Sequence, residues 1–418
     1  SCPDEGMKWD ICKYIFENNK LPKGDEQAIR NPIWGISYAF QPILTYMIGA
    51  GFMKVASIFT MDKFSLVVAA RLVSTVSMTL SIYFVIKIAD KLFKDKEIYK
   101  ILFVVFIAFQ PITAFLASYI NNDSTAVLAT TMIIYLWILG LESNWKTKHC
   151  VLLGLAIGFC ALTYYNAYGY ILCSIILCLV SVTSNKMKAK DVWQKILVVG
   201  LIAITFAGWW FVRNAILYNG DFLGMNSMLG INAQNECGDK YALHDYKPST
   251  RLTFQKEGKS LIYMIVEKEW LNTTAVSFIG IFGYHTIMMS TKIYYCYLAI
   301  WVIGAIGCLI NFKELFMYKK EEKNKYLLNY IFVASIIIPV LLSMYYSYAS
   351  DYQPQGRYIM GIIVPFTYFL VKGIETLLEK FIKSEKIRNV IIIALMLLII
   401  VISFKAIFGY IIPAYRGK

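Results

Sequence analysis

Long apolar runs separated by short polar segments recur along most of the chain. An α-helix needs about 20 predominantly apolar residues to cross a bilayer, and most of these runs approach that length. Charged residues gather between the runs rather than within them. The pattern therefore predicts ten membrane-spanning helices, at residues 64–89, 101–118, 124–141, 150–163, 168–182, 193–211, 293–310, 327–344, 358–378 and 390–410.

The stretches outside the long runs predict the rest of the organisation. Residues 1–36 are polar and contain Pro and Gly, which predicts an ordered loop with one short helix near residues 8–18. Residues 37–60 are more apolar, with Pro42 at a first helical turn, and predict a helix along the membrane interface. The runs at 150–163 and 168–182 are short for a bilayer, so tilted or kinked helices are expected. The predicted parts are an external first loop (1–63), a helical core (64–213), an external region (214–291) and carboxy-terminal helices (292–418).

Composition agrees with an all-α polytopic membrane protein. Of the 418 residues 58% are hydrophobic, and the mean hydropathy is +0.55. The formal charge of +14 comes from lysines clustered in alternate loops, which is typical of loops facing the cytoplasm and does not indicate a nucleic-acid partner. These loops lie at 91–100, 146–148, 186–195, 313–325 and 380–388.

The same alternation places residues 1–63, 214–291 and 345–357 outside the cell membrane. An external amino-terminal loop predicts one further helix upstream of Ser1 in the complete gene product. Three cysteines, Cys2, Cys12 and Cys237, would lie outside, so a disulfide between two of them stays open.

Polar groups at the external ends of the predicted helices form the main functional signal. Groups at one depth can converge on one cavity, even when five separate segments supply them. The first segment holds Asp4 and Glu5. The others hold Asn121, Asn122 and Asp123; Tyr164 and Tyr165; Arg213 and Asn214; and Gln355, Arg357 and Tyr358.

Each group also has a purely structural interpretation. Asp4 and Glu5 could be solvated loop charges, and residues 121–123 could be a turn in which Asp123 or Ser124 caps the next helix. Arg213 could reach lipid phosphates beside an interfacial tryptophan pair. Arg357 favours a ligand more strongly, since it is the only basic residue in its loop and Gly356 permits close backbone approach.

Several chemistries have no support in the sequence. Nucleotide-binding loops and the serine-hydrolase elbow are absent, and only three histidines occur. A divalent cation held by Asp4 and Glu5 stays open. An enzyme acting outside needs a donor delivered through the membrane, such as a lipid-linked phosphosugar. Arg357 and Arg213 for phosphate, the helices for a lipid tail, and Asp4 or Glu5 as base suit such a donor.

These motifs resemble the C-type membrane glycosyltransferases (the GT-C superfamily). The resemblance rests on the acidic pair in the first loop, the many-helix topology and the run from Gly154 to Thr163. Within the superfamily, four motifs resemble a bacterial branch known mainly as a domain of unknown function: Pro3 to Gly6, Asn121 to Asp123, Trp210 to Asp221, and Gln355 to Tyr358.

The resemblance implies inverting transfer of a sugar from a polyprenyl phosphate-linked donor to a glycan or another cell-envelope acceptor. It implies Asp4 as general base and Glu5 as helper or metal ligand. Gln355 and Tyr358 would assist Arg357 at the donor phosphate. Many relatives carry a lysine after the Leu-Thr pair, where this chain has Tyr164. This departure shifts phosphate binding to Arg357 and Arg213.

Two other functions fit the same residues. A transporter or flippase of lipid-linked saccharides would use the same charges for binding only, although such proteins commonly show midplane charges or inverted repeats. A polymerase or ligase of surface glycans would share the donor and differ in its acceptor.

Overall fold

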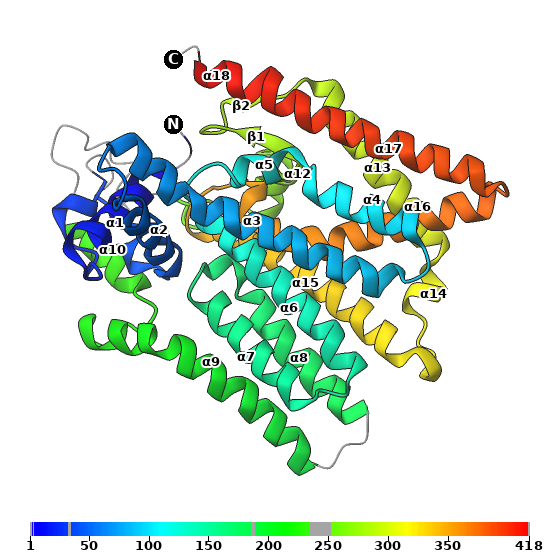
Figure 1. Cartoon of the computed structure of the whole chain (residues 1–418), viewed down its shortest axis with the longest axis horizontal. Coiled ribbons are helices and arrows are strands. Elements are labelled where there is room, and N and C mark those ends of the chain that lie inside the picture. The colour runs from blue at the N-terminus through cyan, green and yellow to red at the C-terminus, as the bar shows by residue number, and fades with distance from the viewer. Residues whose placement is uncertain (1, 3, 32–34, 185–188, 235–251, 417–418) are drawn as a thin grey trace.

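The computed structural model describes residues 2, 4–31, 35–184, 189–234 and 252–416, and helices dominate these parts (Figure 1). Seven of the described helices are long and apolar enough to cross a membrane, which confirms the predicted all-α polytopic membrane class. They are α3 (Lys63–Phe93), α6 (Asn122–Glu142), α9 (Ala189–Leu217), α13 (Thr291–Ile310), α15 (Lys323–Ala349), α16 (Ile363–Phe381, preceded by the 3₁₀ turn η7, Gly356–Ile362) and α17 (Glu385–Lys405, continued by η8, Ala406–Ile411, and α18, Ile412–Arg416).

Helices α6 and α9 show the two extremes of burial. In the apolar stretch of α6, 83% of the residues are buried, whereas only 11% are buried in that of α9. Apolar side chains such as Trp193 and Ile204 are exposed along α9, which runs along the edge of the molecule (Figure 1). A helix that is apolar on all sides and lies at the edge presents a surface suited to lipid.

Three predicted spans have a different form. The run at 101–118 is divided into α4 (Glu97–Ala108) and α5 (Pro111–Leu116). Pro111 lacks an N–H and disfavours helix in the residue before it, so α4 ends there and Pro111 begins a new helix. The runs at 150–163 and 168–182 form the short helices α7 (Thr147–Ala161) and α8 (Gly169–Ser184), joined by the 3₁₀ turn η3 (Tyr165–Ala167).

A separate lobe forms at the amino-terminal end. It consists of α1 (Glu5–Asn18), the 3₁₀ turns η1 (Gln27–Ile29) and η2 (Tyr38–Phe40), and α2 (Leu44–Ala56), and it packs against α3 and the end of α9. The helix predicted at 8–18 thus begins at Glu5. Cys2 and Cys12 are free and buried, and Cys237 lies outside the described residues.

The predicted external region 214–291 contains short elements. These are α10 (Met225–Gln234), α11 (Leu261–Val266), α12 (Trp270–Gly280) and a hairpin of β1 (Ile281–Phe282) with β2 (Ile287–Met288). The strands are antiparallel, with Ile281 opposite Met288. Further along, α14 (Phe312–Phe316) and η6 (Lys320–Glu322) connect α13 to α15.

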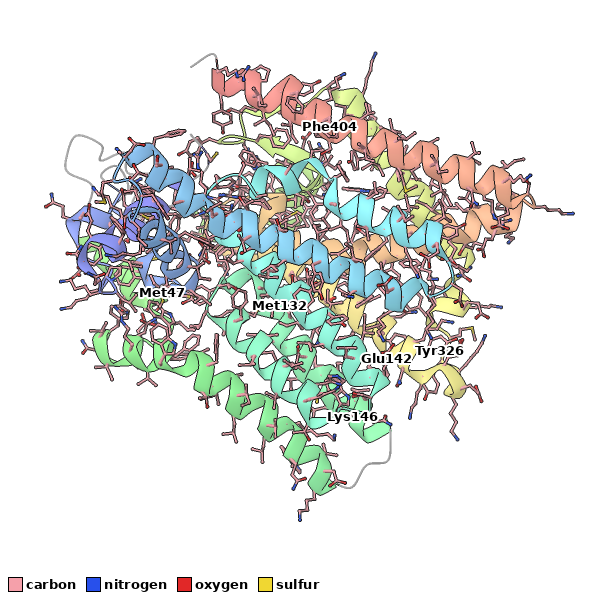
Figure 2. The ribbon with its side chains drawn as sticks, viewed as in Figure 1. Met47, Met132, Glu142, Lys146, Tyr326 and Phe404 are labelled. Atoms are coloured by element: carbon pink, nitrogen blue, oxygen red, sulfur yellow. The ribbon has the colours of Figure 1, made fainter. Side chains whose placement is uncertain are left out.

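The lysine-rich loops and the amino-terminal lobe lie at opposite ends of the helices. Lys91 pairs with Glu142 at 2.8 Å, and Lys96 pairs with Glu375 at 2.6 Å, so the ends of α3, α6 and α16 meet at the lysine-rich end. Figure 2 shows Glu142, Lys146 and Tyr326 at this end and Met47 of the lobe at the other. The loops therefore form two sets, as the alternating charge predicts, while the compartment that each set faces stays a prediction.

Close packing of α13 on α16 depends on glycines. A Cβ atom added at Gly307 would lie 1.9 Å from the carbonyl oxygen of Gly373, which is a backbone atom that no side-chain rotation can move. We expect Gly307→Ala to force the helices apart and to lower the free energy of unfolding by about 1–3 kcal/mol. Thermal unfolding in lipid measures this. Gly200→Ala is the control, because its Cβ would meet no atom within 4 Å, and equal effects of the two variants would contradict the prediction.

Candidate functional site

Arg357 lies at the centre of a buried polar cluster at the lobe end of the bundle. Its side chain is only 8% exposed. The guanidinium donates hydrogen bonds to Gln355 Oε1 at 2.7 Å, to the Tyr358 hydroxyl at 3.0 Å and to the Tyr119 hydroxyl at 3.5 Å. It also forms an ion pair with Asp4 Oδ2 at 3.2 Å. The structure thus brings together four of the residues predicted from sequence, Asp4, Gln355, Arg357 and Tyr358.

Gly356 places Arg357 in this position. A Cβ at Gly356 would lie 2.2 Å from the backbone nitrogen of Phe278, so only glycine allows η7 to contact α12 this closely. The Gly356 N–H also donates to the Ser277 hydroxyl. The close approach expected of Gly356 is therefore to the protein's own backbone.

The two adjacent carboxylates of the first loop have different partners. Asp4 precedes α1 with φ of +56° and pairs with Arg357. Glu5 accepts two hydrogen bonds from Arg71 at 2.8 Å each and one from the Ile120 N–H at 3.1 Å. Glu5 therefore joins α1 to α3 and to the start of α6. Among the described residues, no three His, Cys, Asp or Glu side chains gather as a metal site would require.

Asp123 supplies a second carboxylate to the cluster. It lies in the first turn of α6, where Asn121 accepts from the Ser124 N–H at 2.8 Å and acts as the helix cap. Asn122 donates to the Thr163 carbonyl at 3.3 Å. Asp123 is 4% exposed, and its Oδ1 has no hydrogen-bond partner among the described residues. The helix cap is therefore Asn121 and not Asp123 or Ser124 as predicted, and Asp123 has an unused acceptor.

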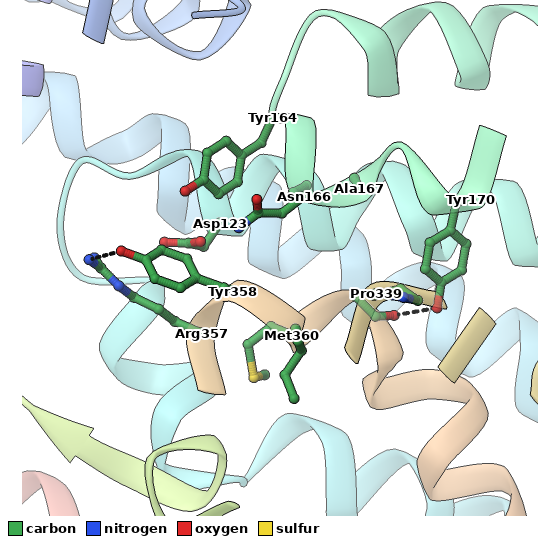
Figure 3. Close-up of a pocket in the computed structure, with 12 residues that line it drawn as sticks. Asp123, Tyr164, Asn166, Ala167, Tyr170, Pro339, Arg357, Tyr358 and Met360 are labelled. Carbon is green, nitrogen blue, oxygen red and sulfur yellow. Dashed lines mark hydrogen bonds between the residues drawn. The ribbon is translucent and has the colours of Figure 1, made fainter. Parts of the chain in front are cut away.

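A small cavity separates Asp123 from Arg357 and Tyr358. Tyr164 and Asn166 also line it, and their polar ends face Tyr358 and Asp123 in Figure 3. The cavity volume is about 10 Å³, which is room for roughly one water molecule. A sugar does not fit in this space, so binding one requires the surrounding elements to separate.

Three of the predicted residues make their contacts elsewhere. Arg213 donates to the Pro22 carbonyl and to Asn214, and it stacks on Trp210 at 4.9 Å. Asn214 is fully buried, and Tyr165 donates to the Leu223 carbonyl. None of these contacts is with the Arg357 cluster. Arg213 instead connects the lobe to the end of α9, and its role at a donor phosphate beside Arg357 stays a prediction.

Lys8 is a member of the cluster that sequence reasoning missed. It lies one turn after Asp4 on α1, is 7% exposed, and interacts electrostatically with Arg357, Asp4 and Asp123. Its ammonium lies 5.7 Å from the centre of the Tyr38 ring. Burial, followed by the Arg357 charge, lowers the pKa of Lys8. The four-residue spacing from Asp4 was the available signal, because residues i and i+4 share one face of a helix.

His285 lies on the other side of Arg357. It is at the tip of the β1–β2 hairpin with φ of +59°, and with Ser277, Gln355 and Arg357 it lines a second cavity of about 10 Å³. Burial lowers the pKa of His285 to about 4, and the positive charge of Arg357 makes a smaller contribution in the same direction. The imidazole is therefore neutral at physiological pH.

This pKa predicts a pH dependence of stability. The folded value of about 4 is below the unfolded value of about 6.5, so protonation favours the unfolded chain. The contribution of neutral His285 to the free energy of unfolding is complete above about pH 6.5 and is lost as the pH falls towards about 4. We expect His285→Gln to lose less stability than the wild type between pH 7 and pH 5, as measured by thermal unfolding. An identical loss in both proteins would contradict the assignment.

The fold and the cluster define a multi-helix membrane protein with a buried charged site at one end of its bundle. Residues 17–366 match the family described as "Predicted membrane protein (DUF2142)", and the chain belongs to this family. No curated protein matches the sequence.

Among solved structures, an archaeal oligosaccharyltransferase has a similar fold, which agrees with the predicted GT-C resemblance. The oligosaccharyltransferase AglB of Archaeoglobus fulgidus, in complex with an inhibitory peptide and a dolichol-phosphate, has a TM-score of 0.56 at 12% identity, covering 97% of this chain and 51% of AglB. Its complex with Zn and sulfate gives 0.55 at 11% identity, covering 97% of this chain and 48% of that one. ArnT of Cupriavidus metallidurans bound to undecaprenyl phosphate has a TM-score of 0.39 at 16% sequence identity, covering 90% of this chain and 73% of ArnT. The chain thus spans about half the length of AglB, and these identities establish similarity of fold alone.

Proposed function

We propose that this protein is an inverting glycosyltransferase that takes a sugar from a polyprenyl phosphate-linked donor. The acceptor is a component of the cell envelope, and the site lies on the extracytoplasmic face of the cell membrane. The observation that carries the proposal is the buried Asp4–Arg357 pair at one end of a GT-C-like bundle. Residues 353 positions apart in sequence supply the carboxylate and the cation that such a transfer needs.

The Asp4–Arg357 pair matches the two groups whose charge changes during transfer, which are the acceptor hydroxyl and the donor phosphate. A hydroxyl oxygen of the acceptor attacks the anomeric carbon, and the bond from that carbon to the donor phosphate oxygen breaks with its electron pair. Asp4 accepts the hydroxyl proton, and Arg357 stabilises the negative charge that returns to the phosphate. The ion pair places the Asp4 carboxylate beside the guanidinium, so the base and the phosphate-binding group lie together.

Donor binding has to separate Asp4 from Arg357, since the cavity beside them has room for roughly one water. The pair connects the lobe to η7, so movement of the lobe would widen the site and release one donor of Arg357 for the phosphate. Tyr358 and Gln355 hold the guanidinium from the η7 side during this exchange. The dolichol-phosphate in the complex of AglB suggests a polyprenyl phosphate as the lipid to test.

A donor panel tests the proposal. The full-length protein in lipid is incubated with radiolabelled polyprenyl-phosphate sugars and candidate acceptors, with and without a chelator, and release of free polyprenyl phosphate is measured. We expect release with at least one donor and loss of release in Asp4→Asn, but not in the exposed-loop control Asp25→Asn. Tight donor binding without release in any combination would contradict the transferase and favour the transporter.

A further inference from the structure

Lys8 is a buried cation without a matching anion. Its side chain is 93% removed from solvent, yet among the described residues no hydrogen-bond acceptor or carboxylate oxygen lies within bonding distance of its ammonium. Even the partly exposed Lys96 has such a partner, since it pairs with Glu375 at 2.6 Å. The Lys8 ammonium lies over the ring of Tyr38, 5.7 Å from its centre.

An ammonium in this environment is costly to the folded chain. Burying a charge is tolerated when an opposite charge and hydrogen bonds compensate it, and a cation–π contact compensates only part of the lost hydration. The nearest carboxylates do not remove this cost. Asp4 is paired with Arg357 and Glu5 with Arg71, and Asp123 forms no hydrogen bond or ion pair with Lys8. The charge of Arg357 also opposes that of Lys8. Unfavourable charge burial of this kind is characteristic of functional sites.

We propose that Lys8 and Arg357 together form a phosphate-binding subsite, in which the Lys8 ammonium takes the place that Arg213 was expected to fill. Arg357 offers a planar fork from η7, and Lys8 offers a point charge from α1, so the two cations approach from different elements. A tetrahedral phosphate can contact both because its oxygens point in different directions. The ligand class is a phosphate ester.

Phosphate binding at this subsite would also change the contacts between the lobe and η7. Lys8 and Asp4 lie on one face of α1, one turn apart, with the Lys8 N–H bonded to the Asp4 carbonyl at 3.2 Å. A phosphate that replaces Asp4 on Arg357 while attracting Lys8 exchanges one contact between α1 and η7 for another. The carboxylate is then available as base while the lobe remains attached. This inference rests on the proposed function only for the identity of the lipid.

A binding experiment tests the subsite without any turnover. The protein is placed in phosphatidylcholine nanodiscs, and its thermal midpoint is followed during titration with a polyprenyl phosphate, the matching polyprenol or inorganic phosphate. We expect the polyprenyl phosphate to stabilise the wild type and the polyprenol not to. Lys8→Met should weaken this binding at least about tenfold, which corresponds to roughly 1.4 kcal/mol. Lys13→Met on the same helix is the matched control, since Lys13 is exposed and pairs with Glu17.

Stability without ligand separates a ligand site from a structural lysine. If Lys8 awaits an anion, Lys8→Met should be at least as stable as the wild type before ligand is added, because an uncompensated charge has been removed. Lys8→Gln is the second neutral variant, in case the methionine variant does not fold. An unchanged midpoint shift in both neutral variants overturns the proposal, as does failure of both to fold.

The two sources of phosphate give different results. Lys8-dependent stabilisation by inorganic phosphate alone, equal to that by the lipid, supports the anion subsite and overturns the lipid as its ligand. Lys8-dependent binding of the polyprenyl phosphate without sugar release from any donor supports the subsite and contradicts the transferase. Failure of the subsite and failure of the proposed function are therefore distinguishable.

Discussion

Arg357→Ala should abolish sugar transfer and also lower the free energy of unfolding by about 3–5 kcal/mol, because it removes one partner of a buried ion pair. The variant leaves Asp4 without its cation and the hydroxyls of Tyr119 and Tyr358 without their donor. Both effects follow from one side chain that contacts four other residues. The sequence alone predicts the loss of transfer with the fold intact, and the burial of Arg357 adds the loss of stability.

Arg357→Lys separates these two effects. A lysine keeps the charge opposite Asp4 but loses the planar fork that contacts several acceptors at once, so most of the stability should remain while transfer falls. Thermal unfolding and donor turnover are measured on the same preparations, with Arg388→Ala as a control near the predicted cytoplasmic end. Turnover near the wild-type level in Arg357→Lys would show that the fork is unnecessary. Full turnover in a folded Arg357→Ala protein would show that Arg357 has no role in sugar transfer.

The helical class was predictable because it depends on long apolar runs. A bilayer imposes a length of about 20 residues on each crossing, so the spans appear in the sequence before any tertiary contact is known. Alternating lysine clusters likewise predicted two sets of loops at opposite ends of the helices. The Lys91–Glu142 and Lys96–Glu375 pairs lie at the lysine-rich end. The division at Pro111 was missed, although the physical signal, a proline inside an apolar run, was in the sequence.

The candidate site was harder to predict because its partners are far apart in sequence. Asp4, Asp123 and Arg357 were each identified from their position at a predicted helix end, yet nothing in the chain indicated that Arg357 would pair with Asp4. Arg213 is also a basic residue at a predicted external helix end, like Arg357. Only the packing of the lobe against α9 directs its side chain to the Pro22 carbonyl. Lys8 was not identified as a site residue, because burial of its charge is a tertiary property.

The two carboxylates of the cluster differ in a way that predicts which one is the base. Asp4 pairs with Arg357 and directly precedes α1 of the lobe, whereas Asp123 lies in the first turn of α6 with an oxygen that has no hydrogen-bond partner among the described residues. We expect Asp4→Asn to lower turnover by about 10²–10⁴-fold, the range typical of general-base catalysis. Its stability should fall by only about 1 kcal/mol, since the amide oxygen can still accept from Arg357.

Asp123→Asn provides the matched comparison at the same cluster. The substitution removes a buried charge whose Oδ1 has no partner among the described residues, so stability should be unchanged or higher, and turnover should fall less than about tenfold. Single-turnover rates at saturating donor measure both variants. The reverse order of rate losses would assign the base to Asp123 and leave Asp4 as the group that holds Arg357 until the donor binds.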